Sequence, residues 1–380
     1  MKSTNRQQIY LDYNASTPLD PRVASVMQGT MQHAFGNPSS THWAGTPAYA
    51  IVDSARRQVA GLLGCKPAQI VFTSGGSESN NQVLKGIYFA SQVPGSHIIT
   101  TSIEHPAIVE PCRFLERLGA RITWLPVDAT ACMNPDDLIR SITADTTLIS
   151  IMHANNETGT IQPVEECAQI AREHGIPFHT DAAQSVGKIP ARVDDLGVDF
   201  LSIAGHKLYA PKGIGALYIR EGTKLEPLIH GAGHELGRRA GTESALLTAA
   251  LGQACELAQD LSAMARIRAL RNQLWTGLKE GCGNRVVLNG HAGKCLPNTL
   301  NVSFAGHIGT EILAQIPELA ASTGSACHSG RVELSPVLQA MGISPEVGAG
   351  AVRFSLGRTT TTEEIEEVIK MLIPLLGKRA

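Results

Sequence analysis

Residues 176–207 read IPFHTDAAQSVGKIPARVDDLGVDFLSIAGHK, and they contain two short apolar runs that each end in a charged side chain. The first run leads to Asp181 and the second leads to Lys207. Both runs are short and rich in β-forming residues, so each is predicted to be a strand buried in a sheet. Charged groups are costly to bury at strand ends. The pair therefore predicts a bound group with a cation for Asp181 and a carbonyl carbon for Lys207.

Pyridoxal phosphate meets both requirements. Its pyridinium nitrogen pairs with a carboxylate, and its aldehyde forms a Schiff base with a lysine amine. The sequence therefore predicts this cofactor, with Asp181 and Lys207 as its two main anchors.

Outward from this stretch, helical and strand patterns alternate from about Thr46 onward. Residues 46–64 are predicted to form a helix with Thr46 as its N-cap and Gly64 as its stop, and another helix is predicted to open at Pro106. This alternation favours an α/β fold in which helices sandwich a mostly parallel sheet. In such a fold the ligand lies at the carboxyl ends of the strands.

The pattern changes after Gly241. Two long helical stretches are followed by a smaller α+β region, whose last helix is predicted to begin at a capping box formed by Thr361 and Glu364. We therefore expect a large cofactor-binding domain at residues 16–262. Residues 1–15 and 263–380 are expected to form a small domain.

The composition excludes several classes of protein. The chain has 380 residues, of which 43% are hydrophobic and 17% charged, as in ordinary globular proteins. A net charge of −2 and an aromatic content of 4% argue against binding to nucleic acid. No segment has the apolar length to span a bilayer, and the first residues lack an apolar signal core, so a cytoplasmic protein is expected. None of the eight cysteines forms a C-x-x-C pair, and no metal site is predicted.

Two segments could bind the cofactor's phosphate. In TSGGSES, residues 73–79, Gly76 lets the backbone approach an anion at a helix N-terminus, and Ser77 adds a hydroxyl. In SIAGHK, Ser202 and His206 lie close to Lys207. Taken alone, the first segment is equally well explained as an ordinary glycine-rich turn, and the second as a surface turn.

Three further polar residues follow predicted strands. Gln184 could reach the cofactor's phenolic oxygen, and Asn156 could bond that oxygen or a substrate carboxylate. His105 could stack on a planar ring and move protons. Taken alone, each is at least as well explained as an ordinary polar, capping or core residue.

A series of motifs then identifies a family. In order along the chain, the motifs closely resemble those of the cysteine desulfurases of the class V aminotransferase group, a fold-type-I pyridoxal phosphate family. The motif STGSAC is similar to the cysteine motif of the subgroup that includes the nitrogen-fixation and iron–sulfur-cluster enzymes. The motifs are YLDYNASTPLDPRV, FGNPSS, VFTSGGSESNN, EHPAI, SIMHANNETG, HTDAAQSVGK, SIAGHKLYAPKGIGALY, GHELGRRAGTES, STGSAC and VRFSLGR.

The resemblance implies a seven-stranded-type sheet and a role for each candidate residue at the cofactor. Lys207 holds the cofactor and later abstracts the substrate's α-proton, Asp181 pairs with the pyridine nitrogen, and His105 stacks on the ring and shuttles protons. Gln184 and Asn156 become partners of the ring oxygen. The implied phosphate ligands are Gly76, Ser77, Ser202 and His206, together with Thr242 from the other subunit of a homodimer.

The resemblance also implies the reaction. Arg353 holds the carboxylate of L-cysteine, for which a guanidinium offers a bidentate fork. Cys327, in the segment STGSACHSG that is predicted to be a mobile loop, attacks the substrate sulfur as a thiolate. The products are L-alanine and a Cys327 persulfide, which passes to a sulfur-acceptor protein, as in iron–sulfur cluster assembly.

Other functions stay open at this point. Ala204 stands where the family usually has a serine, so one phosphate hydroxyl is missing. Within enzymes, the alternative is a selenocysteine lyase or another class V aminotransferase, which does not need Cys327. From a different class, the alternative is a non-catalytic sulfur-assembly subunit that keeps the fold.

Overall fold

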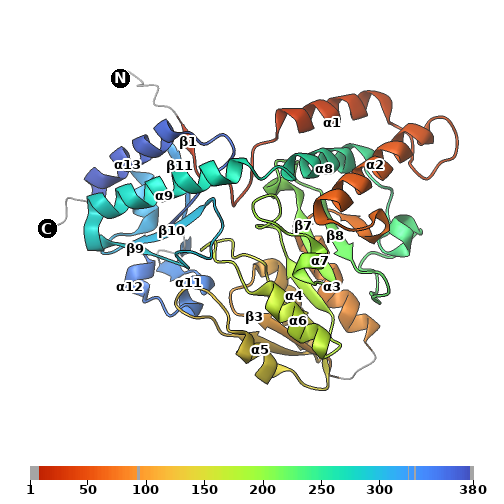
Figure 1. Cartoon of the computed structure of the whole chain (residues 1–380), viewed down its shortest axis with the longest axis horizontal. Coiled ribbons are helices and arrows are strands. Elements are labelled where there is room, and N and C mark those ends of the chain that lie inside the picture. The colour runs from red at the N-terminus through yellow and green to blue at the C-terminus, as the bar shows by residue number, and fades with distance from the viewer. Residues whose placement is uncertain (1–7, 92–94, 324, 329–330, 377–380) are drawn as a thin grey trace.

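A seven-stranded sheet forms the centre of the larger part of the molecule (Figure 1). The computed structural model describes residues 8–91, 95–323, 325–328 and 331–376, with the backbone alone for 325–328 and 331–333. The strand order in the sheet is β2-β8-β7-β6-β5-β3-β4, and β8 is antiparallel to both of its neighbours while the other pairs are parallel. The predicted α/β fold with a mostly parallel sheet is therefore confirmed. The strands are β2 (Ile70–Thr73), β3 (His97–Thr101), β4 (Arg121–Leu125), β5 (Thr146–Ser150), β6 (Phe178–Asp181), β7 (Phe200–Ala204) and β8 (Gly215–Ile219).

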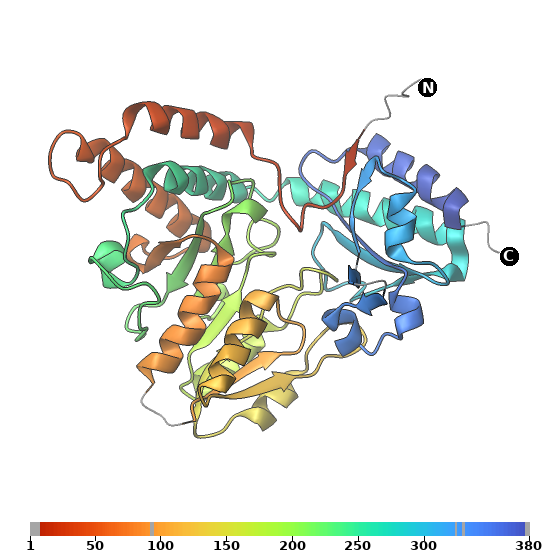
Figure 2. The same ribbon diagram turned by 180° about the vertical axis from the view of Figure 1, so that it is seen from behind.

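Helices cover both faces of this sheet because successive strand residues point to opposite sides. Val71 and Leu148 pack on the side of α3 and α4, whereas Phe72 and Ile149 pack on the side of α2, α6 and α8. Figure 2 shows α3 and α4, in orange, lying over the strands. The helices of this part are α1 (Pro21–His33), α2 (Gly45–Leu63), α3 (Gly76–Ala90), α4 (Pro106–Arg117), α5 (Pro135–Ser141), α6 (Val164–Glu173), α7 (Val193–Leu196) and α8 (Ala245–Ala258), with short 3-10 turns η1 (Pro67–Gln69), η2 (Gly205–Lys207) and η3 (His234–Gly237).

The predicted boundaries of α2 are half right. Gly64 ends the helix in a left-handed conformation, with φ of 70°, as predicted. Thr46 is not the N-cap, because the helix already begins at Gly45, with Ala44 as its cap. The carbonyl of His42 accepts from the N–H groups of both Gly45 and Thr46, which extends the helix backward.

The smaller part is built around a four-stranded antiparallel sheet of order β12-β15-β10-β9. Its hydrophobic core joins Ile9 and Leu11 to residues between Ile267 and Leu376, and the core of the larger part draws on residues between Val23 and Ala258. This distribution is consistent with the two domains, whose boundaries stay a prediction. The elements are β1 (Ile9–Tyr10), α9 (Ala263–Cys282), η4 (Gly283–Arg285), β9 (Val286–Leu288), β10 (Thr299–Phe304), α10 (Gly309–Ala314), β11 (Leu319–Ala320), β12 (Ser322–Thr323), α11 (Pro336–Ala340), α12 (Pro345–Gly348), β15 (Ala351–Ser355) and α13 (Thr362–Leu376).

The segment that carries Cys327 is a short hairpin. Strands β13 (Ser325–His328) and β14 (Arg331–Leu334) are antiparallel, and Cys327 pairs with Val332. The prediction of a loop is therefore wrong for Ser325–His328, which form a strand because β14 pairs with them. The side chain of Cys327 lies outside the described residues.

Within the described residues, no helix combines the length and the apolar character that crossing a bilayer requires.

The predicted capping box of α13 is present. The Glu364 carboxylate accepts from the Thr361 N–H at 2.9 Å, and the Thr361 hydroxyl accepts from the Glu364 N–H at 3.2 Å. We expect Thr361→Ala to lower the free energy of unfolding by about 1 kcal/mol, because the helix loses its N-cap acceptor. Urea unfolding followed by circular dichroism measures this loss. Thr362→Ala, one residue further along the exposed turn, is the matched control, and an equal loss in both variants would contradict the capping role.

Candidate active site

A cavity of about 430 Å³ opens where strands β6 and β7 end. Its volume is within the range of small-molecule sites, and its position at the carboxyl ends of parallel strands is the one expected for this class of fold. The sheet brings together residues that lie far apart in the sequence. The cavity is lined by Asn14, Ala15, Gly76, Ser77, Asn80, His105, Ala107, Met152, Ala154, Asn156, Asp181, Ala183, Gln184, Ala204, His206, Lys207 and Arg353.

Asp181 is a buried carboxylate at the last position of β6, with 8% of its surface exposed. One oxygen accepts from the amide of Asn80 at 2.7 Å, and the other accepts from the N–H of Ala183 at 2.9 Å. Both donors are neutral, so hydrogen bonding orients the carboxylate and leaves its charge available to a cation in the cavity.

Lys207 lies in the 3-10 turn η2, directly after β7. Its ammonium donates to the main-chain carbonyls of Asn14 and, at 2.7 Å, Ala15. These carbonyls hold the amine at the cavity wall, and no carboxylate in the part of the chain that the structure describes pairs with it. Asp181 and Lys207, which the sequence predicts to share a ligand, thus line the same cavity.

The N-terminus of α3 forms one side of the cavity. Gly75 caps the helix with φ of 151°, a conformation that favours glycine, and Gly76 and Ser77 follow in the first turn. The first N–H groups of a helix have no partner within the helix and attract anions. A Cβ atom at Gly76 would lie 3.4 Å from the Cβ of Ala204, which is close to an ordinary contact, so this turn lies directly beside the end of β7.

Two predicted phosphate ligands of the SIAGHK segment differ in their positions. His206 lines the cavity, and burial together with the nearby Lys207 lowers its pKa to about 4, so the ring is neutral near pH 7 and can donate one N–H. Ser202 is fully buried within β7, and its hydroxyl is bonded to a ring nitrogen of His179 at 3.0 Å. Its position beneath the strand end contradicts the predicted contact with phosphate.

The remaining ring-contacting candidates all line the cavity. The His105 ring caps α4, and its Nδ1 accepts from the Ala107 N–H at 3.1 Å. Burial lowers the pKa of His105, whereas the charge of Asp181 raises it and the charge of Lys207 lowers it further. Gln184 donates its amide N–H to the Asn14 carbonyl at 3.0 Å. Asn156 contributes its main-chain carbonyl to the network around Arg353.

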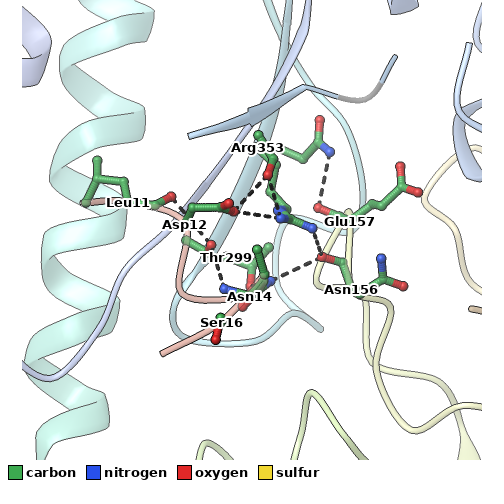
Figure 3. Close-up of polar contacts among 12 residues, drawn as sticks. Leu11, Asp12, Asn14, Ser16, Asn156, Glu157, Thr299 and Arg353 are labelled. Carbon is green, nitrogen blue, oxygen red and sulfur yellow. Dashed lines mark hydrogen bonds and ion pairs between the residues drawn. The ribbon is translucent and has the colours of Figure 1, made fainter. Parts of the chain in front are cut away.

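Arg353 reaches the cavity from β15 of the smaller part (Figure 3). One terminal nitrogen donates to the Asn156 carbonyl at 2.9 Å, and the other donates to the Asp12 carboxylate at 2.7 Å and to the Ser322 hydroxyl at 2.9 Å. The Nε atom is buried and lacks a partner among the described residues. The guanidinium is therefore fixed in place, and its Nε–H is among the donors left unused.

Two predicted residues lie elsewhere. Thr242 is exposed and does not line this cavity, as expected of a residue that would act on another subunit. Cys327 is placed only by its backbone, in β13 of the smaller part. The roles of both residues stay predictions.

Sequence reasoning missed three residues that organise the site. Asn14 accepts from Lys207 and Gln184, Asn80 holds Asp181, and Asp12 holds Arg353. Asn80 and Asp12 lie within quoted motifs, as does Asn14, but no local pattern names their distant partners. For Asp12 and Asn14 the signal that could have found them is a polar residue between apolar or aromatic neighbours, whereas Asn80 has polar neighbours and offers no such signal.

These features fit pyridoxal phosphate. A buried carboxylate with neutral donors suits the pyridinium nitrogen, Lys207 suits the aldehyde, and the glycine-containing N-terminus of α3 suits the phosphate. Arg353 adds a positive charge for a substrate anion in the same cavity.

Comparison with known proteins agrees with this geometry. The family model described as aminotransferase class-V matches residues 9–368. The cysteine desulfurase IscS of Dictyoglomus turgidum is 46% identical over 377 residues, which cover 98% of this chain and 95% of that protein. A solved NifS-like protein is 36% identical with a TM-score of 0.92, covering 98% of this chain and 100% of its own.

A further solved structure, SspA in complex with cysteine, is 38% identical with a TM-score of 0.81 and covers 93% of this chain and 99% of its own. The match to the family model spans both parts of the fold and every described residue of the site. The chain therefore belongs to the class V aminotransferase family, whose members bind pyridoxal phosphate.

Proposed function

We propose that this protein is a cysteine desulfurase that converts L-cysteine to L-alanine and leaves the sulfur as a persulfide on Cys327. The observation that carries the proposal is the convergence of Asp181, Lys207 and Arg353 on one cavity. It is supported by the 46% identity to a cysteine desulfurase over nearly the whole chain.

The bound cofactor supplies an electron sink for negative charge at the substrate's α-carbon. Asp181 keeps that sink effective, because its buried charge favours a protonated ring nitrogen. Gly76, Ser77 and His206 hold the phosphate. Gln184 and Asn156 face the ring oxygen, and His105 covers the ring. Thr242 completes the phosphate site from a second subunit.

Arg353 binds and orients the substrate through its carboxylate. Its terminal nitrogens are already fixed by Asp12 and Asn156, so the guanidinium cannot turn away from the cavity. A substrate carboxylate in the cavity is attracted by the charge of this guanidinium, which lines the cavity wall. The amino acid is thereby positioned with its α-carbon toward Lys207.

Lys207 acts as the proton carrier. Burial, with the nearby Arg353 as the next cause, lowers its pKa from 10.5 to about 8. A sizeable fraction of the amine is therefore neutral near pH 8 and able to take the α-proton.

Cys327 accepts the sulfur. As its thiolate forms a bond to the substrate sulfur, the bond between that sulfur and the substrate β-carbon breaks, and the β-carbon gains a proton to give alanine. The outer sulfur of the persulfide then passes to a thiol of an acceptor protein, for which iron–sulfur cluster assembly is the proposed setting.

A selenocysteine lyase or aminotransferase is the alternative enzyme, and a non-catalytic sulfur-assembly subunit is the alternative outside enzymes. A cytoplasmic location stays part of the proposal.

We further propose that the protein is a homodimer. Large apolar side chains are exposed around the α1–α2 connection and η3, among them Trp43 at 79%, Phe35 at 77% and Leu236 at 75%. Leu236 is held outward with φ of 58°, next to Glu235, which is buried and paired with Arg56 at 2.6 Å. Such a patch marks an interaction surface.

A hollow of about 1010 Å³ lies within this surface, lined by Tyr49, Leu236 and Glu243 among others. Thr242 is the neighbour of Glu243, so the proposed contact with a second subunit and the proposed phosphate ligand lie together. A second copy of the chain is the occupant that fits both.

Replacing Cys327 tests the desulfurase function. Cys327→Ala is expected to lower sulfide release from L-cysteine by at least about 100-fold, as expected for loss of a nucleophile, while the visible cofactor band persists. Sulfide and alanine assays with a thiol reductant measure the effect, and mass spectrometry of the wild-type protein detects the added sulfur on Cys327. Cys132→Ala is the control. Unchanged turnover of L-cysteine in Cys327→Ala would exclude the proposal, and turnover of selenocysteine alone would favour the lyase.

The lowered pKa of Lys207 predicts how cofactor attachment depends on pH. The neutral amine attacks the aldehyde, so the attachment rate of the cofactor-free protein should rise about tenfold per pH unit below pH 8 and level off above it. Stopped-flow absorbance records this rate. An Nα-blocked lysine, whose pKa is about 10.4, serves as the reference amine. A rate that keeps rising to pH 10 contradicts the lowered pKa.

Charged substitutions test the dimer. The double variant Trp43→Asp with Leu236→Asp should sediment as a monomer and lose cofactor more readily, because Thr242 no longer reaches a partner. Sedimentation equilibrium gives the mass, and Phe89→Asp, at an exposed aromatic residue elsewhere, is the control. A monomeric wild-type protein with full cofactor content would overturn the proposed shared site.

A further inference from the structure

Lys188 is a buried lysine behind the cavity, seven residues after Asp181 and outside every role assigned above. Its ammonium donates to the side-chain oxygen of Gln184 at 2.8 Å and to that of Asn14 at 3.2 Å. No carboxylate among the described residues forms an ion pair with it. Burial lowers its pKa well below the usual value, and Lys207 and Arg353 lower it further. Burying an amine without a counter-ion costs free energy of folding, so its hydrogen bonds indicate a specific role.

The third N–H group of Lys188 has room for a water partner. A small cavity of about 20 Å³ is lined by Lys188, Lys207 and Arg358 among others. This volume suffices for about one water molecule. The hydrogen-bonding capacity of the amine can therefore be satisfied at this position without an acid.

Lys188 helps to orient two amides, and at Asn14 it does so together with Asn298, whose NH₂ group donates to the same side-chain oxygen at 3.0 Å. The Lys188 amine donates to the side-chain oxygen of each amide, so both amides present that oxygen to Lys188 and turn their NH₂ group away from it. For Asn14, the NH₂ group then donates to the Thr299 hydroxyl at 2.9 Å and to the Asn156 carbonyl at 3.2 Å. Of these two acceptors, Asn156 lines the cavity and Thr299 lies in β10 of the smaller part.

For Gln184, the hydrogen bond from Lys188 to the side-chain oxygen leaves the NH₂ group on the cavity side. It donates to the Asn14 carbonyl at 3.0 Å, and Gln184 lines the cavity. One of its two N–H groups is therefore available to an acceptor on the cofactor. With the amide turned over, its oxygen would face the cavity and repel an anionic oxygen there.

We propose that Lys188 is a positioning residue that locks the Gln184 amide with its N–H toward the cavity, so that Gln184 donates a hydrogen bond to the phenolic oxygen of the cofactor. This inference rests on the proposed cofactor contact of Gln184. Lys188 itself touches neither the cofactor nor the substrate and acts through Gln184, with Asn14 oriented in the same way.

The test uses the holoenzyme and its visible absorption band. A hydrogen bond donated to the phenolic oxygen stabilises the anion and lowers the pH at which the bound cofactor loses its proton. Lys188→Met should therefore raise the midpoint of the spectral pH titration by about 0.7 pH unit. The cofactor dissociation constant should rise by about threefold to tenfold. Lys66→Met, at an exposed lysine paired with Glu221 on the surface, should change neither quantity.

A double-mutant cycle separates positioning from simple packing. In a Gln184→Ala background, Lys188→Met should produce no further shift of the midpoint, because the group through which it acts is absent. An equal shift in both backgrounds, or no shift in Lys188→Met alone, would overturn the proposal. If Lys188→Met does not fold, Lys188→Gln carries the same cycle, because a neutral amide both donates and accepts and no longer forces one orientation of Gln184.

This readout is independent of the proposed reaction. The spectral titration contains no cysteine, so failure of desulfurase activity leaves it unaffected. Conversely, an unchanged midpoint in a protein that releases sulfide normally rejects the role of Lys188 alone.

Discussion

The buried carboxylate of Asp181 is the constraint around which the site is arranged. Its hydrogen-bond donors, Asn80 and the Ala183 N–H, are neutral, so they orient the carboxylate and do not neutralise its charge. The cavity at the end of β6 is the place where a cation can reach this charge. Lys207 and the N-terminus of α3 then face the same space because parallel strands end at one edge of a sheet.

The sequence predicts well those features whose physical cause is local. The strands that end at Asp181 and precede Lys207 are short apolar runs, and the capping box of Thr361 and Glu364 needs only residues one turn apart. The same holds for α4, which Pro106 opens. In each case the information lies within a few residues of the element that forms.

Errors arose where depth or a distant partner decides the outcome. Ser202 has the right spacing from Lys207 but lies under the strand end, bonded to His179. The serine- and glycine-rich segment at Cys327 lacks a strand pattern, yet its backbone pairs with β14. Sequence patterns assign no role to Asp12 or Lys188, because the tertiary fold brings their partners to them and the spacing of residues along the chain does not indicate those partners.

The N-terminal segment links the two ends of the chain, and this has a consequence for biosynthesis. Asp12 holds Arg353 across 341 residues, and Asn14 bonds the Ser355 hydroxyl across a similar separation. Contacts this distant in sequence form late, because a long loop must close first. A ribosome-bound chain that already carries the complete seven-stranded sheet would still lack Arg353, which lines the cavity at the edge of that sheet. The cavity thus gains the charge of this guanidinium only after β15 has been synthesised and has joined the N-terminal segment.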